Sequence, residues 1–366
     1  MKNHLGGIFF MAKKSASFLG ANTPKGFISF FDELYNPYDS IDAYIIKGGP
    51  GTGKSTFMKR IADEAEKRGY DTERVYCSSD PSSLDGLIIP KLGFSICDGT
   101  SPHVMEPRFP GVSENIINLG QFWDVQKLRK SSDTVKRLFF ENSLCHRRSS
   151  KYLAAAGHID AQSRMLTEKY IKRDKIDSFC SRFIHRELRG EKKCMAGEKK
   201  RRFISAITPK GNIILADTVT ALCPRVIGID DGQGAVSSLI TSCIGEGAVR
   251  NGYDVIYCHC PMRPDESEHL LIPEKGIAII RVNGAAGEIS SDRIIHAGRF
   301  MSEDFKDNRL MLRFNEKIKR ELISESISCL KKAKSVHDEL EKIYIDAMDF
   351  EALDSYCQSF IGRLFT

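Results

Sequence analysis

The chain has 366 residues, of which 41% are hydrophobic, and its formal net charge at pH 7 is +6. This length suits two domains of ordinary size better than one large core. The eleven cysteines are odd in number and scattered, and no apolar run reaches membrane-spanning length, which argues against disulfide-rich secreted proteins and membrane-spanning proteins. We therefore expect a soluble cytoplasmic protein with reduced thiols, and the early apolar patch GIFFMA is too short for a signal peptide.

The first informative stretch is residues 44–58, YIIKGGPGTGKSTFM. An apolar strand, the pattern G-x-x-x-x-G-K-S and an amphipathic helix follow one another, which is the context of a phosphate-binding loop. Loop N–H groups would bind phosphate oxygens, Lys54 would neutralise the β- and γ-phosphates, and Ser55 would ligate Mg²⁺. The predicted binding residues for ATP and Mg²⁺ are Gly48, Gly49, Pro50, Gly51, Thr52, Gly53, Lys54, Ser55 and Thr56.

Residues 75–86, VYCSSDPSSLDG, predict a second strand followed by two acids. Ligands of open α/β sheets bind just past the carboxyl ends of strands, where Asp80 lies. Asp80 or Asp85 could therefore position an attacking water, and Asp80 could instead accept a proton from a substrate hydroxyl. The open alternative is that Asp80 caps a helix formed by the segment after Pro81.

A third apolar strand ends at Asp98. In a parallel sheet its end lies beside the loop, so we predict that Asp98 is catalytic and, with Ser55, holds Mg²⁺ through water. An ordinary strand-ending turn at Asp98-Gly99 is the alternative. His103 and Arg108 follow in a predicted loop near the phosphates, where Arg108 could stabilise transition-state charge or simply be exposed.

Positive charge is concentrated in residues 127–202, which contain 22 lysines and arginines against 9 acids. This segment carries +13, so the rest of the chain sums to −7. Residues 127–189 have helical apolar spacing, and their cations could be solvated helix faces, a surface for nucleic acid or another polyanion, or a lid over a nucleotide. The basic run 191–202 is predicted to be a linker.

The chain also repeats itself. FLGANTPKG at 18–26 recurs as FISAITPKG at 203–211, and IDSFCSRFI at 176–184 recurs as LDSYCQSFI at 353–361. Further matches between them keep the same order, which indicates a tandem duplication. The predicted units are a first half at 1–190, the linker at 191–202 and a second half at 203–366.

The second copy of the loop, VIGIDDGQGAVSSL, keeps glycines and loses the charges that a nucleotide needs. Its two carboxylates would repel a triphosphate, and no metal ligand remains. We therefore predict one nucleotide per chain, bound in the first half. With Gly53 aligned on Gly234, the pairs are Ala235 with Lys54, Val236 with Ser55, Arg281 with Asp98, and Asp230 and Asp231 with Gly49 and Pro50.

The stretches NTPKGF, KGGPGTGKST, CSSDPSSLDGLIIP, DGTSPH and INLGQFWD, together with the duplication, resemble a family of bacterial P-loop proteins described as ATPases or as nucleotide-kinase-like. The resemblance covers nearly the whole chain. It implies a P-loop NTPase fold with residues 48–56 as the nucleotide loop, and it implies no substrate. That family often keeps a lysine in the second loop, where this chain has Ala235, so a two-site mechanism is not expected here.

These observations predict an α/β fold with two tandem P-loop NTPase-type halves. Each half is expected to have a mostly parallel sheet, flanking helices and a helical hairpin appended at its end. The predicted function is Mg²⁺-dependent binding and hydrolysis of ATP in the first half. The alternatives are a small-molecule or nucleotide kinase and an ATP-dependent nucleic-acid-binding module. The sequence predicts no membrane contact and leaves the oligomeric state open.

Overall fold

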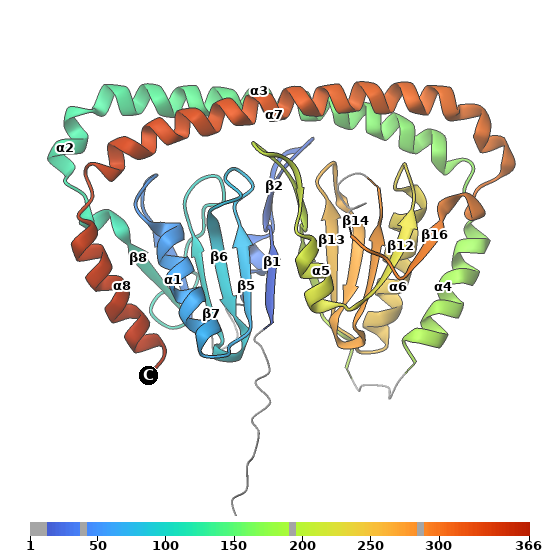
Figure 1. The fold of residues 1–366 in the computed structure, drawn as a ribbon, viewed down its shortest axis with the longest axis horizontal. Helices are drawn as coiled ribbons and strands as arrows, with labels where there is room; N and C mark the ends of the chain where they lie inside the picture. The colour runs from blue at the N-terminus through green and yellow to red at the C-terminus, as the bar shows by residue number, and fades with distance from the viewer. Residues whose placement is uncertain (1–12, 37–41, 190–194, 284–288) are drawn as a thin grey trace, which may run out of the picture.

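The computed structural model describes residues 13–36, 42–189, 195–283 and 289–366. Two similar α/β halves stand side by side, and two long helices run above both of them (Figure 1). Each half contains a six-stranded sheet. The predicted α/β class and the duplicated organisation are therefore confirmed. The GIFFMA patch and residues 191–194 of the predicted linker lie outside the described residues.

The first sheet has the strand order β1-β5-β6-β7-β4-β8. Its strands are β1 (Lys14–Ser17), β4 (Asp42–Lys47), β5 (Thr72–Tyr76), β6 (Leu84–Ile89), β7 (Phe94–Asp98) and β8 (Glu114–Asn118). All neighbours pair in parallel except that β6 is antiparallel to β5 and β7. The sheet is therefore mixed, because the short connections on either side of β6 reverse the chain. Helix α1 (Lys54–Lys67) follows β4.

The second sheet repeats this pattern, with the order β16-β12-β15-β14-β13-β9. Its strands are β9 (Lys199–Arg202), β12 (Arg225–Asp230), β13 (Val255–Cys260), β14 (Arg263–Ile272), β15 (Ile277–Arg281) and β16 (Arg293–His296). Here β14 is the antiparallel strand, and helix α6 (Ala235–Arg250) follows β12. Strand β9 consists of the last four residues of the predicted linker, so the second sheet begins at Lys199 and not at residue 203 as predicted.

The two halves meet through their equivalent N-terminal segments. Phe18 donates its N–H to the carbonyl of Phe203 at 2.8 Å, and Phe203 donates back to Phe18 at 2.9 Å. These two residues occupy the same place in the repeat, so the contact is reciprocal, like that of an isologous dimer. The interface also contains β2 (Gly20–Thr23), β3 (Gly26–Ser29), β10 (Ser205–Thr208), β11 (Gly211–Ile214) and α5 (Ala216–Leu222).

The two long helices, α3 (Ser132–Glu168) and α7 (Arg309–Ile345), pack against each other in opposite directions. Asn142 near the start of α3 bonds to the carbonyl of Ala333 near the end of α7, and Ser149 bonds to Ser326 at 2.7 Å. At 1.5 Å per residue each helix is about 55 Å long. Each helix is therefore long enough to carry the chain from one half to the other.

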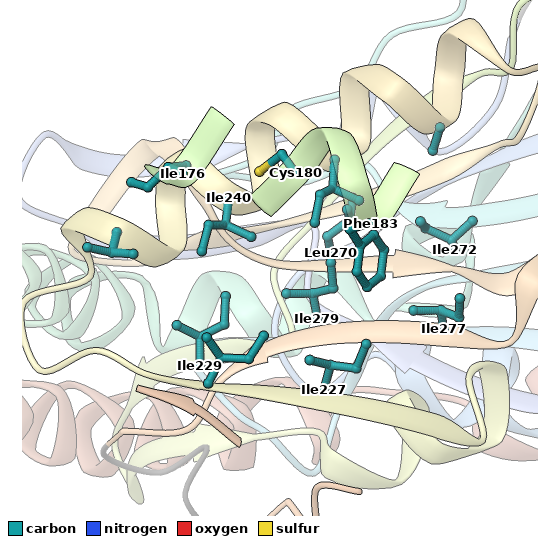
Figure 2. Close-up of a cluster of buried hydrophobic side chains, with 14 of the residues drawn as sticks. Ile176, Cys180, Phe183, Ile227, Ile229, Ile240, Leu270, Ile272, Ile277 and Ile279 are labelled. Carbon is teal, nitrogen blue, oxygen red and sulfur yellow. The ribbon is translucent and has the colours of Figure 1, made fainter. Parts of the chain in front are cut away.

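The helix after each long helix packs on the opposite half. Helix α4 (Arg173–Glu187) places Ile176, Cys180 and Phe183 in the core of the second sheet, beside Ile240 and Leu270 (Figure 2). Helix α8 (Phe350–Leu364) does the same in the core of the first sheet. The predicted hairpin on each half is therefore wrong, because α3 and α7 pair with each other and deliver their last helices to the other sheet (Figure 1).

Short helices complete the described chain. They are α2 (Val125–Lys130) and the 3₁₀ helices η1 (Phe31–Glu33), η2 (Pro90–Leu92), η3 (Leu119–Phe122), η4 (Pro273–Lys275), η6 (Ala297–Phe300) and η7 (Glu303–Asn308). Within the described ranges, every helix is too short or too polar to cross a lipid bilayer.

Candidate functional site

The glycine loop, residues 48–53, connects β4 to α1. Gly51 and Gly53 have φ values of 67° and 81°, in the left-handed region that L side chains rarely adopt. Gly53 caps α1, so the free N–H groups and the positive end of the helix dipole face the loop. The predicted order of strand, glycine loop and helix is therefore present, and it forms an anion-binding geometry.

Lys54 and Asp98 come together beside this loop. The Lys54 ammonium donates to the carbonyls of Gly48 at 3.0 Å and Gly49 at 2.7 Å, and it lies 3.5 Å from Asp98 Oδ2. Asp98 reaches this position because β7 pairs in parallel with β4, with Asp98 opposite Ile46. The two side chains are only 11% and 13% exposed, so their attraction is weakly screened by water.

The other predicted loop residues have separate contacts. Ser55 accepts a hydrogen bond from the N–H of Leu84 at 2.9 Å, which ties the start of α1 to the start of β6. The buried Thr52 hydroxyl donates to the carbonyl of Gly49 at 2.9 Å and holds the loop closed. Pro50 lies in the turn of the loop, and Thr56 is exposed on the first turn of α1.

Asp85, Asp98 and His103 form a cluster in which the candidate ligand atoms lie within 4.8 Å of one another. They come from β6, the end of β7 and the loop that follows. Asp85 is buried, and this burial, followed by the nearby charge of Asp98, raises its pKa to about 7. The Cys77 thiol lies within hydrogen-bonding reach of Asp85. Burial also lowers the pKa of His103.

The sequence did not identify His103 as a site residue, although it placed this histidine near the phosphates. The His103 ring stacks on Phe31, with ring centroids 4.3 Å apart. Both of its ring nitrogens are buried without a hydrogen-bond partner among the described residues. Such unpaired nitrogens cannot be found from sequence, because they depend on how the loop after β7 folds against η1.

Asp80 mainly closes the turn that leads into β6. It accepts hydrogen bonds from the N–H and hydroxyl of Ser82, and its other oxygen lies 3.3 Å from the Lys334 ammonium on α7. Burial would raise the pKa of Asp80, but these bonds hold it below its ordinary value. Residues 81–83 form a turn that leads directly into β6, so Asp80 closes this turn and the predicted helix cap is wrong. The described partners of Asp80 do not include Lys54 or Asp98.

Residues from the second half cover the glycine loop. A Cβ atom on Gly49 would lie 2.8 Å from the Tyr344 ring, and one on Gly51 would lie 2.8 Å from the Glu341 carbonyl oxygen. A Cβ atom on Gly53 would lie 3.0 Å from Leu353 of α8. The absence of side chains at these glycines thus allows α7 and α8 to pack against the loop, and it also allows the tight backbone turns. Local sequence patterns gave no signal for this contact, because it joins parts of the chain about 300 residues apart.

The second half has a shorter loop than the sequence alignment implied. Six residues separate the end of β4 from α1, whereas four separate the end of β12 from α6. Because Ile46 pairs with Asp98 and Ile229 with Arg281, the strands align Asp231 with Gly48 rather than with Pro50. The earlier pairing of Asp230 and Asp231 with Gly49 and Pro50 is therefore wrong. A turn shortened by two residues cannot form the same cradle.

Protein groups fill the anion-binding position of the second half. The buried Asp231 carboxylate accepts hydrogen bonds from the N–H groups of Val236 and Ser237, both at 2.8 Å. These are the helix N–H groups that would otherwise bind an anion. Arg281 donates to the Asp231 carbonyl and pairs with Glu268, which occupies the position equivalent to Asp85. The two acids of the first half are thus replaced by an internal ion pair.

The cations of the predicted basic segment lie mostly on exposed faces of α2, α3 and α4. Some of them pair locally, as Arg137 does with Glu141 at 2.9 Å. The nearest contacts of Gly49, Gly51 and Gly53 come from α7 and α8 instead. The segment 127–189 is therefore not the element that covers the glycine loop.

Comparison with protein-family models, with curated proteins and with solved structures gives no match. The function proposed below consequently depends on the residues of this chain and on the geometry that they form.

Proposed function

We propose that the first half is a P-loop NTPase-type unit that binds ATP with Mg²⁺ and hydrolyses it. The observation that carries this proposal is the position of Lys54, at the start of α1 directly after the glycine loop and 3.5 Å from the carboxylate of Asp98. A lysine, a helix N-terminus and a nearby acid are the groups that a nucleoside triphosphate and its metal require.

Each residue has a chemical role in this proposal. Lys54 and the loop N–H groups stabilise the negative charge of the β- and γ-phosphates. Ser55 and Asp98 supply hard oxygen ligands of the kind that Mg²⁺ prefers. When bound, the metal would neutralise charge that develops on the phosphate oxygens. Asp85 is assigned the positioning of the attacking water, because Asp80 is occupied by Ser82 and Lys334.

The second half is proposed to be catalytically inactive. Its helix N-terminus is occupied by Asp231, and Ala235 stands at the position of Lys54. A triphosphate would have to displace a carboxylate that is already hydrogen-bonded, and it would find no lysine to compensate its charge. We therefore propose one nucleotide per chain.

The decisive experiment compares ATP turnover by the full-length protein and its Lys54→Ala variant. Loss of one preorganised electrostatic group costs ~3 to 4 kcal/mol of transition-state stabilisation, so turnover should fall about 100- to 1,000-fold. Lys67→Ala, at the exposed end of the same helix, is the matched control and should retain turnover. Equal turnover by folded Lys54→Ala and wild-type protein would refute the proposed site.

Two further candidate functions use the same structure. A small-molecule or nucleotide kinase would use Asp85 to accept the proton of an acceptor hydroxyl, and turnover would then depend on a metabolite. A nucleic-acid-binding ATPase is favoured by the exposed cations of α2, α3 and α4. In that case DNA or RNA would stimulate turnover, whereas a plain ATPase would be unaffected by either addition.

A further inference from the structure

We infer that Asp85, Asp98 and His103 bind a divalent transition-metal ion, such as Mn²⁺, in preference to Mg²⁺ and without nucleotide. The role of the ion rests on the proposed function, whereas the binding of the ion does not depend on it. It concerns the nucleotide-free protein, where two carboxylates and an imidazole would hold the ion, whereas Ser55 and Asp98 hold Mg²⁺ with ATP in the proposed function.

The three side chains are close enough to share one ion. Their ligand atoms lie within 4.8 Å of one another, and His103 Nε2 is 4.0 Å from Asp85 Oδ2. Ligands that sit 2.0 to 2.2 Å from a metal are at most about 4.4 Å apart. Only one pair of three ligands can lie on opposite sides of the ion, and the other pairs would be about 3 to 3.5 Å apart, so side-chain rotations of roughly 1 to 2 Å would bring all three onto one ion.

The unpaired nitrogens of His103 point independently to a ligand. The residue is only 6% exposed, and neither ring nitrogen has a hydrogen-bond partner among the described residues. Leaving a buried polar group unpaired costs about 1 to 3 kcal/mol. The stack on Phe31 fixes the ring plane, and the ring places Nε2 toward Asp85. A metal ion between them would use a lone pair that otherwise has no partner.

The charge of the cluster also favours a cation. Asp85 and Asp98 are two carboxylates in a poorly solvated place, and Lys54 supplies a single positive charge beside them. An uncompensated buried carboxylate is costly. In the second half the equivalent positions carry Glu268 and Arg281, which neutralise each other directly. In the first half Lys54 pairs with Asp98, and the described contacts of Asp85 include no cationic side chain of lysine or arginine, so a divalent ion would supply the remaining positive charge.

The ligand types select the class of ion. Mg²⁺ is held mainly by oxygen atoms and keeps several waters, whereas imidazole suits iron, nickel, copper and zinc. Mn²⁺, which accepts carboxylate ligands and is the weakest binder of the first-row divalent series, is the most stringent probe of this class. Asp98 Oδ1 is oriented by the N–H and hydroxyl of Thr100, which leaves Oδ2 on the side of Lys54. One oxygen of Asp85 can bind the ion while the other still positions water, so the two roles of Asp85 are compatible.

The test is a Mn²⁺ titration of the nucleotide-free, full-length protein, with free Mn²⁺ measured by electron paramagnetic resonance. We expect one ion per chain, displaced by Mg²⁺ only at a large molar excess. His103→Phe keeps an aromatic ring on Phe31 but removes the nitrogen ligand, and should weaken Mn²⁺ binding at least about 100-fold, since even second-shell changes cost 10- to 100-fold. Asp85→Asn should do the same, and His158→Phe, on an exposed face of α3, is the matched control.

Lys54→Ala separates this inference from the proposed hydrolysis. It should lose ATP turnover and keep Mn²⁺ binding, because it removes a neighbouring positive charge and no ligand. The inference is overturned if wild-type protein binds no Mn²⁺ without nucleotide, if Mg²⁺ competes equally, or if folded His103→Phe and Asp85→Asn bind Mn²⁺ as wild type does. Each of these results would leave the Lys54 test of hydrolysis unaffected.

Discussion

Phe360→Ala is expected to destabilise the first half of the chain, although residue 360 belongs to the second copy of the repeat. The Phe360 ring is buried under the first sheet and meets Tyr44 and Phe57, with ring centroids 5.0 and 5.3 Å away. Truncating a buried phenylalanine costs about 3 to 5 kcal/mol. Because 1.4 kcal/mol is a factor of ten, exchange of amides that open through this core should accelerate by about 2 to 3.5 orders of magnitude.

The assay is native-state hydrogen exchange of peptides from β4 and β7 compared with peptides from β12 and β15. Phe183→Ala is the matched variant, because Phe183 is the repeat equivalent of Phe360 and is buried under the second sheet. Each variant should accelerate exchange in the opposite half. The emission of Trp123, the single tryptophan, gives a second probe of the first half. If hydrogen exchange in Phe360→Ala became faster in β12 and β15 and stayed unchanged in β4 and β7, the packing of α8 on the first sheet would be refuted.

Three other outcomes are expected. Asp231→Ala removes an internal cap of α6 and should lower unfolding free energy by about 1 to 2 kcal/mol, whereas Asp231→Asn, which keeps an acceptor, should cost less. Burial alone would raise the pKa of Glu268, but Arg281 lowers it to about 2. The ionised Glu268 therefore stabilises the fold fully above about pH 4.3, and this stabilisation is lost as the pH falls toward 2. The stability difference between wild type and Glu268→Gln should therefore shrink from pH 5 to pH 2 in urea titrations, and a constant difference would contradict the ion pair. If the exposed cations bind nucleic acid, affinity should fall steeply with salt, and reversal of four of them should abolish binding while ATP turnover persists. That variant is Arg147→Glu, Arg148→Glu, Lys172→Glu and Arg173→Glu.

Much of the candidate site was accessible from sequence because its parts are local or lie at the ends of neighbouring strands. The glycine pattern predicted the turn before Lys54, and the apolar run before Asp98 predicted a strand that ends beside it. His103 could not be assigned in this way, since its contact with Asp85 depends on a loop folding back over an antiparallel strand. The pairing of Asp80 with Lys334 likewise joins two halves of the chain.

The duplication was visible in the sequence, but the placement of its last helices was not. The apolar positions of α4 fit a sheet of the kind found in either half, so periodicity alone does not distinguish them. The length of α3 and its antiparallel pairing with α7 determine that α4 packs on the second sheet. The sequence also did not reveal that the loop before α6 is shorter. The two glycine-rich loops can be aligned in several ways, and only the strand pairing fixes where each loop begins and ends.

The reciprocal placement of α4 and α8 has a consequence for how such a chain can arise and diverge. A single half, made alone, would lack the helix that completes its core, and its long helix would be unpaired. Two separate copies would complete each other as a swapped homodimer, with a twofold axis near the contact of Phe18 with Phe203. Joining the copies in one chain keeps these contacts and removes the requirement that both sites be identical. One copy can then retain Lys54 while the other builds Asp231 into its helix.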